Sequence, residues 1–322
     1  MRNTYLIGVL MLALSNSAAA QNTDSISSTA PVLNLSVPNL ELPPISPYAA
    51  PGSPENNPLV KTFELSLKAR LIENGPELSD GIVWRVFSPN IGPDGHLPLI
   101  ASSVGGAAVF DLPPGSYLVH AAFGRAGVTK RITLSNANRS EVMNLDAGGM
   151  KLSASLPDDI PIKSDLVRFT IYADDDNAER SLIVPDVEPD TVIRLNAGTY
   201  HVVSNYGSAN AIIRADIRVE PGKLTEAAVQ HRAAEVTLKL VRDKGGEALA
   251  DTSWSILNVS GDAVRESVGA YSSMVLMEGE YVAVAKNKDR IYQRDFKVSS
   301  GNNEEIEVIA SAEFEVPDDA AD

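Results

Sequence analysis

The sequence predicts an all-β protein in which three tandem seven-stranded sandwich domains follow an export signal and a proline-rich linker. A short pattern, L-x-x-G-x-Y, occurs three times, with its glycines 83 and 81 residues apart. An aromatic residue inside a strand-like run repeats at intervals of 85 residues. The pattern lies at residues 112–117, 195–200 and 276–281, and the aromatic residues are Trp84, Phe169 and Trp254. Two independent markers with nearly the same period indicate a domain repeat.

The segments around these markers alternate apolar and polar residues, as strands with one buried face do. Each repeat opens with such a run and closes with further runs, with Gly, Pro, Asn or Asp between them. The opening runs are residues 63–71, 150–156 and 234–241. About seven short strands in roughly 85 residues are typical of a two-sheet sandwich. We therefore expect sandwich domains at residues 61–149, 150–233 and 234–312, without helices.

Residues 1–20 have the order of a secretory signal peptide. Arg2 precedes an apolar run, and small residues follow it up to Ala20, which is the pattern of a cleaved export signal. The apolar run is too short to span a bilayer as a helix. We expect the chain to be exported to the periplasm or the cell surface, without membrane insertion of the mature chain.

Residues 21–60 are predicted to be a disordered linker. Eight prolines lie between residues 31 and 58, and proline removes backbone donors and favours extended polyproline geometry. Within this segment Leu33, Leu35 and Val37 alternate with polar residues. The run is either plain linker or a docking strand for a partner. At the other end, residues 313–322 contain five acids and are predicted to form a disordered acidic tail.

The composition excludes several classes of partner and site. The formal net charge is −15 and no segment is basic, which argues against nucleic acid or anionic lipid, because both are bound through clustered Lys and Arg. The chain has no cysteine, so disulfides and thiolate metal sites are excluded. Each domain must then be held by apolar burial.

Each residue of the L-x-x-G-x-Y pattern has an expected structural role. The leucine ends one strand, the glycine permits a turn that a side chain would strain, and the tyrosine starts the next strand facing inward. A buried phenol needs a partner for its hydroxyl, and the backbone of the nearby turn can accept that hydrogen bond. The pattern therefore predicts three equivalent tyrosines that fill the core and hold the turn.

The three segments resemble the G-x-Y strand of transthyretin-like (carboxypeptidase regulatory-type) and fibronectin- or immunoglobulin-like sandwiches, which occur as tandem modules in bacterial envelope proteins. The resemblance covers residues 63–310. It implies a non-catalytic module used for spacing, adhesion or docking. It leaves open whether the strand order is transthyretin-like or immunoglobulin-like.

The repeated aromatic residues have two interpretations. Trp84 and Trp254 are favoured as core residues, because Phe169 takes the same place in the middle of its strand. The alternative is that they stack on a sugar ring. Four further aromatic residues in expected loops show no clustering in the sequence: Tyr48, Tyr206, Tyr271 and Tyr292.

No catalytic, cofactor-binding or metal-binding residue is expected. The four histidines, His96, His120, His201 and His231, share no repeated position, and we expect His120 and His201 on the solvated face of their strands. No sequence motif of a hydrolase, a zinc site or a phosphate loop occurs. The acidic run from Asp174 to Asn177 is interpreted as a solvated hairpin tip rather than a calcium site.

The expected protein is therefore a non-catalytic envelope or periplasmic structural and interaction protein, in which a tether leads to an array of sandwich modules. Another envelope protein is the expected partner. The alternative is a carbohydrate-binding or adhesin-type module that recognises cell-wall or host glycans. A hydrolase of a new type is a third hypothesis.

Overall fold

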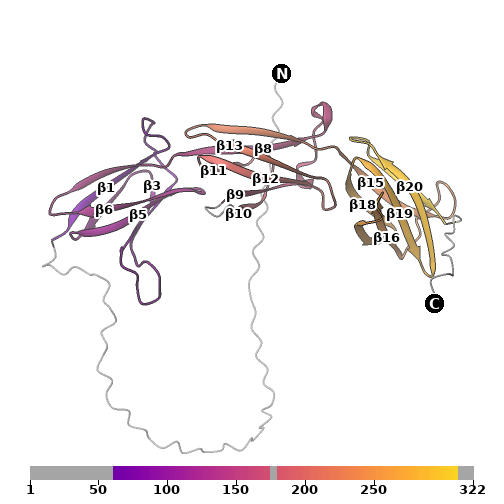
Figure 1. The fold of residues 1–322 in the computed structure, drawn as a ribbon, viewed down its shortest axis with the longest axis horizontal. Coiled ribbons are helices and arrows are strands. Elements are labelled where there is room, and N and C mark those ends of the chain that lie inside the picture. The colour runs from indigo at the N-terminus through magenta and orange to yellow at the C-terminus, as the bar shows by residue number, and fades with distance from the viewer. Residues whose placement is uncertain (1–60, 175–179, 311–322) are drawn as a thin grey trace, which may run out of the picture. The chain divides into compact units, whose positions relative to one another are not determined.

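The computed structural model describes residues 61–174 and 180–310, which contain 21 strands and two short 3-10 turns (Figure 1). The strands form six sheets, and each three-stranded sheet faces a four-stranded one. The prediction of three tandem seven-stranded sandwiches is confirmed. The export signal, the linker and the acidic tail lie outside the described residues. The domain boundaries proposed at 149/150 and 233/234 stay predictions.

The first sandwich is built from strands β1 to β7. Their bounds are β1 Phe63–Arg70, β2 Ile82–Phe87, β3 Leu99–Gly105, β4 Ala108–Leu112, β5 Gly115–Phe123, β6 Ala126–Leu134 and β7 Arg139–Asn144. The three-stranded sheet has the order β4-β1-β7 and the four-stranded sheet the order β3-β2-β5-β6. Strand β1 runs antiparallel to β4 and parallel to β7.

The second and third sandwiches repeat this topology. The second has β8 Ala147–Ser155, β9 Val167–Asp174, β10 Arg180–Val187, β11 Val192–Asn196, β12 Gly198–Tyr206, β13 Ile212–Val219 and β14 Leu224–Gln230. The third has β15 Ala233–Val241, β16 Thr252–Asn258, β17 Ala263–Val268, β18 Tyr271–Met277, β19 Gly279–Asn287, β20 Arg290–Val298 and β21 Glu304–Ile309. Their sheets are β11-β8-β14 with β10-β9-β12-β13, and β18-β15-β21 with β17-β16-β19-β20. The 3-10 turns Pro157–Asp159 and Ser164–Leu166 precede β9.

This strand order differs from one of the orders that the sequence leaves open. An immunoglobulin constant-type sandwich places its first, second, fifth and fourth strands in one sheet and its third, sixth and seventh in the other. Here the second strand of each repeat pairs with the third and the fifth. The immunoglobulin constant-type order is therefore excluded.

The period-2 alternation of the strands produces the core. In β1 every second residue from Phe63 is buried, and β2 buries Ile82, Trp84 and Val86. The repeated aromatic residues lie at the centre of each core, with Trp84 and Phe169 0% exposed and Trp254 1% exposed. The two indoles also donate hydrogen bonds from Nε1 to backbone carbonyls between the third and fourth strands of their repeats, over 2.9 Å. The prediction that these residues are core residues is confirmed.

The three tyrosines of the pattern point inward and hold the turn before them, as predicted. Their hydroxyls donate to the carbonyl four residues earlier, over 2.7 Å from Tyr117, 2.9 Å from Tyr200 and 2.8 Å from Tyr281. Burial raises the pKa of the Tyr117 and Tyr200 phenols. The same bond in all three repeats indicates one structural role.

The role predicted for the glycine of the pattern is wrong. The backbone of Gly115, Gly198 and Gly279 does not lie in the left-handed region, and a Cβ at these positions would meet the following tyrosine ring at 3.5 to 4.0 Å. These are ordinary van der Waals distances. The turn therefore does not require a glycine, because each of these residues already belongs to the extended strand that carries the tyrosine.

Candidate interaction surfaces

The histidines do not form a common site. His96 is exposed in the loop between β2 and β3, while His120 and His201 are part-buried on the outer faces of their sheets. His120 Nδ1 lies 2.9 Å from the Thr129 hydroxyl, and His201 Nδ1 lies 2.8 Å from a carboxylate oxygen of Asp216. In the part of the chain that the structure describes, no group of His, Cys, Asp or Glu is arranged to hold a metal ion.

His231 is a buried residue that the sequence reasoning missed. It follows β14, is 1% exposed, and its Nε2 lies 2.8 Å from the hydroxyl of Ser204. The Tyr206 ring packs edge-on against the imidazole at a centroid distance of 5.7 Å. Burial lowers the pKa of His231 from 6.5 to about 4. Its position just before β15, at the entry to the next repeat, is the only signal that sequence inspection offers.

The first two sandwiches are joined by a hairpin that meets the L-x-x-G-x-Y segment of the next repeat. The turn between β5 and β6 contains Gly124, whose position has a φ of +66°, and a Cβ there would lie 2.9 Å from Cβ of Arg194. Asn196 bonds to the same hairpin through the N–H and the carbonyl of Gly127, and donates to the Leu145 carbonyl. A backbone this close to its neighbour requires glycine.

The second and third sandwiches are joined by the equivalent elements. The turn between β12 and β13 contains Gly207, with a φ of +72°, and a Cβ there would lie 2.7 Å from Cβ of Val275. Asn210 of this turn donates to the hydroxyl of Tyr281 over 2.8 Å and accepts a hydrogen bond from the Met277 N–H over 3.0 Å. Both junctions thus use a left-handed glycine and an asparagine side chain.

The two ends of the array depart from this arrangement. In the hairpin between β19 and β20 the left-handed position is occupied by Lys288, with a φ of +55°. In the first repeat, Pro113 and Pro114 replace the two residues that supply the Met277 N–H and the Glu278 N–H in the third repeat. Proline has no N–H to donate. The positions that join neighbouring sandwiches are therefore altered where the described array has no neighbour.

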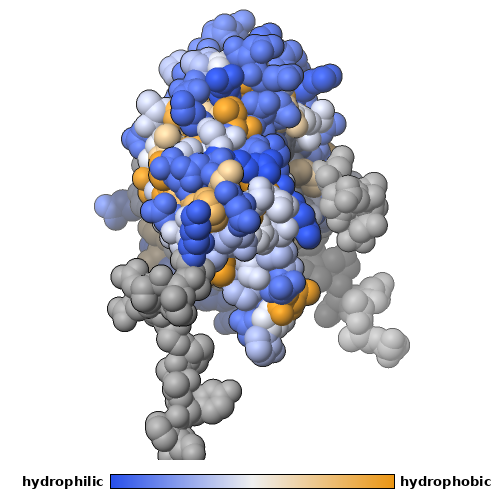
Figure 2. All heavy atoms as spheres, turned by 90° about the vertical axis from the view of Figure 1, so that its left-hand side faces the viewer, coloured by the Kyte–Doolittle hydropathy of each residue, from blue (hydrophilic) through white to orange (hydrophobic). Residues whose placement is uncertain are grey.

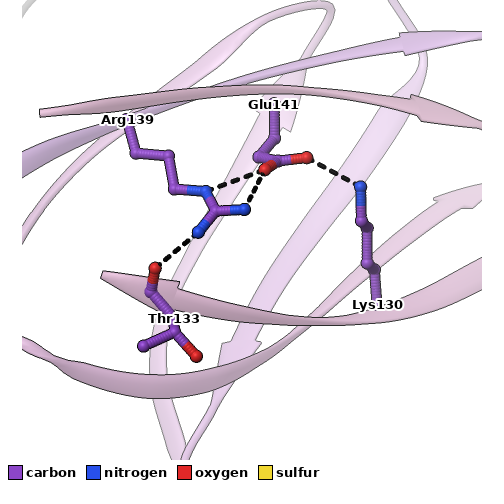
Figure 3. A network of polar contacts seen from close by, with 4 residues as sticks. All are labelled: Lys130, Thr133, Arg139 and Glu141. Atoms are coloured by element: carbon purple, nitrogen blue, oxygen red, sulfur yellow. Dashed lines mark hydrogen bonds and ion pairs between the residues drawn. The ribbon is translucent and has the colours of Figure 1, made fainter. Parts of the chain in front are cut away.

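One long edge of the first sandwich is closed by charged side chains. Glu141 on β7 is paired with Lys130 on β6 at 2.7 Å and with the guanidinium of Arg139, which also donates to the Thr133 carbonyl (Figure 3). The Glu141 side chain is only 13% exposed, and the hydrogen bond from Lys130 holds the pKa of its carboxyl below the ordinary range. This network bridges the two sheets.

The opposite edge of the four-stranded sheet differs among the three repeats. The edge strand β10 carries Pro185 and two register shifts, and β17 carries Arg265 and Glu266. Proline, bulges and charges are the devices that keep an edge strand from pairing with another strand. Strand β3 has no charged residue and no proline, only one irregularity opposite Val86 and Phe87.

Strand β3 also exposes apolar side chains. Leu99 is 54%, Ile100 46% and Val104 76% exposed, and no other described strand pairs with the outer side of β3. Seen from the end of the first sandwich, hydrophobic side chains form small groups among hydrophilic ones (Figure 2). Of the three equivalent edges, β3 is therefore the one open to pairing.

The aromatic residues considered for sugar stacking do not form a platform among the described residues. Tyr206 and Tyr292 are buried, and Tyr271 is exposed. Tyr48, like Asp175, Asp176 and Asn177 of the acidic run, lies outside the described residues. Within residues 61–174 and 180–310, no helix is long and apolar enough to cross a membrane.

Comparison with solved structures finds matches of low similarity. The Bacillus anthracis TIE protein is 16% identical with a TM-score of 0.24, and the alignment covers 78% of this chain but only half of that protein. A streptococcal ancillary pilin is 10% identical with a TM-score of 0.30, over 77% of this chain and 98% of the pilin. BcpA, the major pilin subunit of Bacillus cereus, is 11% identical with a TM-score of 0.21, over 77% and 99%. At this similarity none of them carries an argument about function.

Comparison by sequence gives one family. No curated protein matches the chain. Residues 235–310, which span nearly all of the third sandwich, match the family described as the Rhizobiales growth-associated tandem repeat domain. The third sandwich is thus similar to a domain that is itself described as a tandem repeat, in agreement with the three-fold repeat of this chain.

Proposed function

We propose that this protein is a non-catalytic, exported structural and interaction protein of the cell envelope. Its three sandwiches act as a stiff spacer that holds a docking surface at a set distance from the N-terminal tether. The observation that carries this proposal is the repeated junction, in which Asn196 and Asn210 lock a hairpin of one sandwich against the next.

The recurring residues support a structural role. Trp84 and Trp254 fill cores, the three tyrosines hold turns, and the glycines at positions 124 and 207 allow the sandwiches to approach closely. In an array of this kind each domain contacts its sequence neighbours, so stiffness depends on those contacts. The signal-like residues 1–20 support export.

Spin-label distance measurements test the stiffness of the array. The chain has no cysteine, so single cysteines placed at exposed Ser102 and at exposed Lys297 give one label on the first sandwich and one on the third. We expect a narrow distance distribution. The double variant Gly124→Val and Gly207→Val should broaden it, because each new side chain meets the next sandwich below 3.0 Å.

The matched control is Gly95→Val with Gly245→Val. Both glycines have positive φ, at +79° and +78°, but a Cβ at either position meets nothing within 4 Å. This pair carries the backbone cost without the clash and should leave the distribution narrow. A broad distribution in the unmodified chain would refute the spacer role. Fractionation of the producing cell tests the location, and a chain retained in the cytoplasm would contradict it.

A further inference from the structure

The open edge of β3 lies beside a positive charge that nothing neutralises. Arg85 of β2 is exposed on the outer face of the sheet, directly opposite Ser102 of β3. Among the described residues it makes no hydrogen bond or ion pair. The four strands of this sheet contain no Asp or Glu. Burial, and after it the charge of Arg85, lowers the pKa of the neighbouring His120. The edge therefore suits a strand that brings a carboxylate.

Strand β17 of the third sandwich carries such a carboxylate at an edge of its own. It has six residues, close to the seven of β3, and no other described strand pairs with its outer side. Glu266 is exposed and, within the described part of the chain, makes no hydrogen bond or ion pair. Two residues further on, Val268 is 77% exposed. This edge thus combines an uncompensated negative charge with an apolar side chain.

The backbone of β17 faces outward at these two residues. The Gly269 N–H donates to the Thr252 carbonyl of β16. Bonded and non-bonded pairs alternate along an antiparallel ladder, so the backbone groups of Val268 and Glu266 point away from β16. Ser102 holds the place in β3 that Glu266 holds in β17, since each lies next to the serine opposite the central tryptophan. The two strands therefore offer free backbone groups at matching positions.

An antiparallel pairing of β3 with β17 brings the two charges together. With Glu266 opposite Ser102, Glu266 and Arg85 lie two strand spacings apart, roughly 10 Å between their Cα atoms. Both side chains are long and the serine between them is short, so the carboxylate and the guanidinium can meet above it. The same register places Val268 opposite Ile100, which is 46% exposed. The contact then joins a backbone ladder, an apolar pair and an ion pair.

The charges also select this pairing over the alternatives. Two β17 strands in the matching register would place Glu266 against its own copy, and like charges directly opposite are destabilising. Two β3 strands would bring together two sheets that carry cations and no acid. The remaining edge, β10, has Pro185 and two register shifts. An exposed ion pair adds little affinity, so the backbone ladder supplies the binding and the charges supply the choice of edge.

We propose that β3 of one molecule pairs antiparallel with β17 of a second copy, with Glu266 of the second copy bound to Arg85 across Ser102. The two edges differ and every copy has both, so the contact is heterologous and repeats from copy to copy into rings or open chains. It uses only the edges of the first and third sandwiches. The inference therefore goes beyond the spacer role and does not depend on the stiffness of the array.

Sedimentation equilibrium of the full chain tests the association. We expect the average mass to rise with protein concentration past that of a dimer. Arg85→Glu and Glu266→Arg should each weaken the association about tenfold, because each places like charges together. The variant that combines both substitutions reverses the two charges and restores the attraction. Its association should return to within about threefold of that of the unmodified chain.

Matched controls make the same charge changes elsewhere on the same sandwiches. Arg131→Glu lies on β6, at the other edge of the sheet that contains β3, and Glu247→Arg lies in the loop between β15 and β16. Both residues are exposed. Each control should leave the association unchanged. Hydrogen exchange of the central strands β5 and β19 verifies that every variant remains folded.

Hydrogen exchange of the unmodified chain locates the contact. Protection of β3 and of β17 should rise together with protein concentration, whereas β10 should not change. A chain that is monomeric at every concentration would overturn the proposal, as would a combined variant that associates no better than the single ones. Protection of β3 without β17 would assign the edge to another partner. Protection of both that is independent of concentration would place the pairing within one molecule, and either result overturns the contact between copies.

Discussion

Lowering the pH should destabilise the second sandwich through His231. This residue is 1% exposed, and its ring lies between the Ser204 hydroxyl at 2.8 Å and the Tyr206 ring. The backbone N–H of His231 donates to the Ser155 carbonyl over 2.8 Å. No carboxylate pairs with the imidazole among these contacts, so a proton on the ring would place an uncompensated charge in the core.

The sign and size follow from the pKa of His231. In the unfolded chain the imidazole takes up a proton as the pH falls through 6.5, whereas in the folded protein burial lowers its pKa to about 4. Between these values the unfolded state binds more protons, so stability is lost as the pH falls from about 6.5 to about 4. One pKa unit corresponds to about 1.4 kcal/mol, so the loss has an upper limit of about 3.5 kcal/mol.

Hydrogen exchange of β12 at several pH values, corrected for the intrinsic rate, measures this loss. The two tryptophans, Trp84 and Trp254, lie in the first and third sandwiches, so their fluorescence does not report on the second. Amides of β12 that exchange only on global opening of the sandwich give its free energy of unfolding directly. We expect this free energy to decrease between pH 6.5 and 4.5 in the unmodified chain.

The variant His231→Gln isolates the contribution of the imidazole. It should remove most of the pH dependence above pH 4.5, even where it lowers stability at every pH, because glutamine does not titrate. His96→Gln is the control, since His96 is exposed in a loop and should leave the profile unchanged. Parallel pH profiles for the unmodified chain and His231→Gln would refute the reasoning.

Four further substitutions separate the structural roles. Tyr200→Phe should cost about 1 to 2 kcal/mol of unfolding free energy, because it removes the hydroxyl that donates to the turn. Gly198→Ala should change the unfolding free energy by no more than about 0.5 kcal/mol. Hydrogen exchange of β12 measures both, and a larger loss for Gly198→Ala than for Tyr200→Phe would contradict the role assigned to the tyrosine. Trp84→Phe should lower the unfolding free energy of the first sandwich by about 2 to 3 kcal/mol, since it leaves a cavity and an unpaired carbonyl at Gly106. Urea unfolding followed by hydrogen exchange of β2 measures this loss, and a change below about 1 kcal/mol would count against the core role. Glu141→Gln should lower the unfolding free energy by about 1 kcal/mol near pH 7, and by less as the pH falls through the lowered pKa of the carboxyl. A loss of stability that stays constant down to pH 3 would contradict the ion pairing.

Features that depend on neighbouring residues could be predicted from the sequence. The alternation in residues 63–71 locates β1, and the spacing of Trp84, Phe169 and Trp254 identifies three equivalent core positions. The inward tyrosine follows from the same alternation, and its hydroxyl partner lies only four residues away. Such features involve one strand and the turn before it, where period and residue type are informative.

Features that depend on contacts between repeats could not be predicted. Asn196 acts through Gly127, 69 residues away, and Asn210 through Tyr281, 71 residues away. His231 is buried because it lies where one sandwich leads into the next, which a pattern within one repeat does not reveal. The glycine of L-x-x-G-x-Y was misinterpreted for a related reason, since a conserved spacing inside the chain does not show whether the backbone has a positive φ or an extended conformation.

Differences between the repeats are therefore as informative as their shared pattern. Gly124 and Gly207 each lie against the next sandwich. The equivalent position at the end of the described array is Lys288, and its positive φ shows that the turn keeps the same backbone conformation. Lys288 is exposed, and in the described part of the chain no further sandwich places a residue against it as Arg194 and Val275 lie against the two glycines. A lysine at this position would obstruct the docking of a further sandwich, much as the missing N–H groups of Pro113 and Pro114 would at the other end. Terminal repeats of a stacked array carry polar or blocked outer faces, and Lys288, Pro113 and Pro114 give the first and third described sandwiches this character.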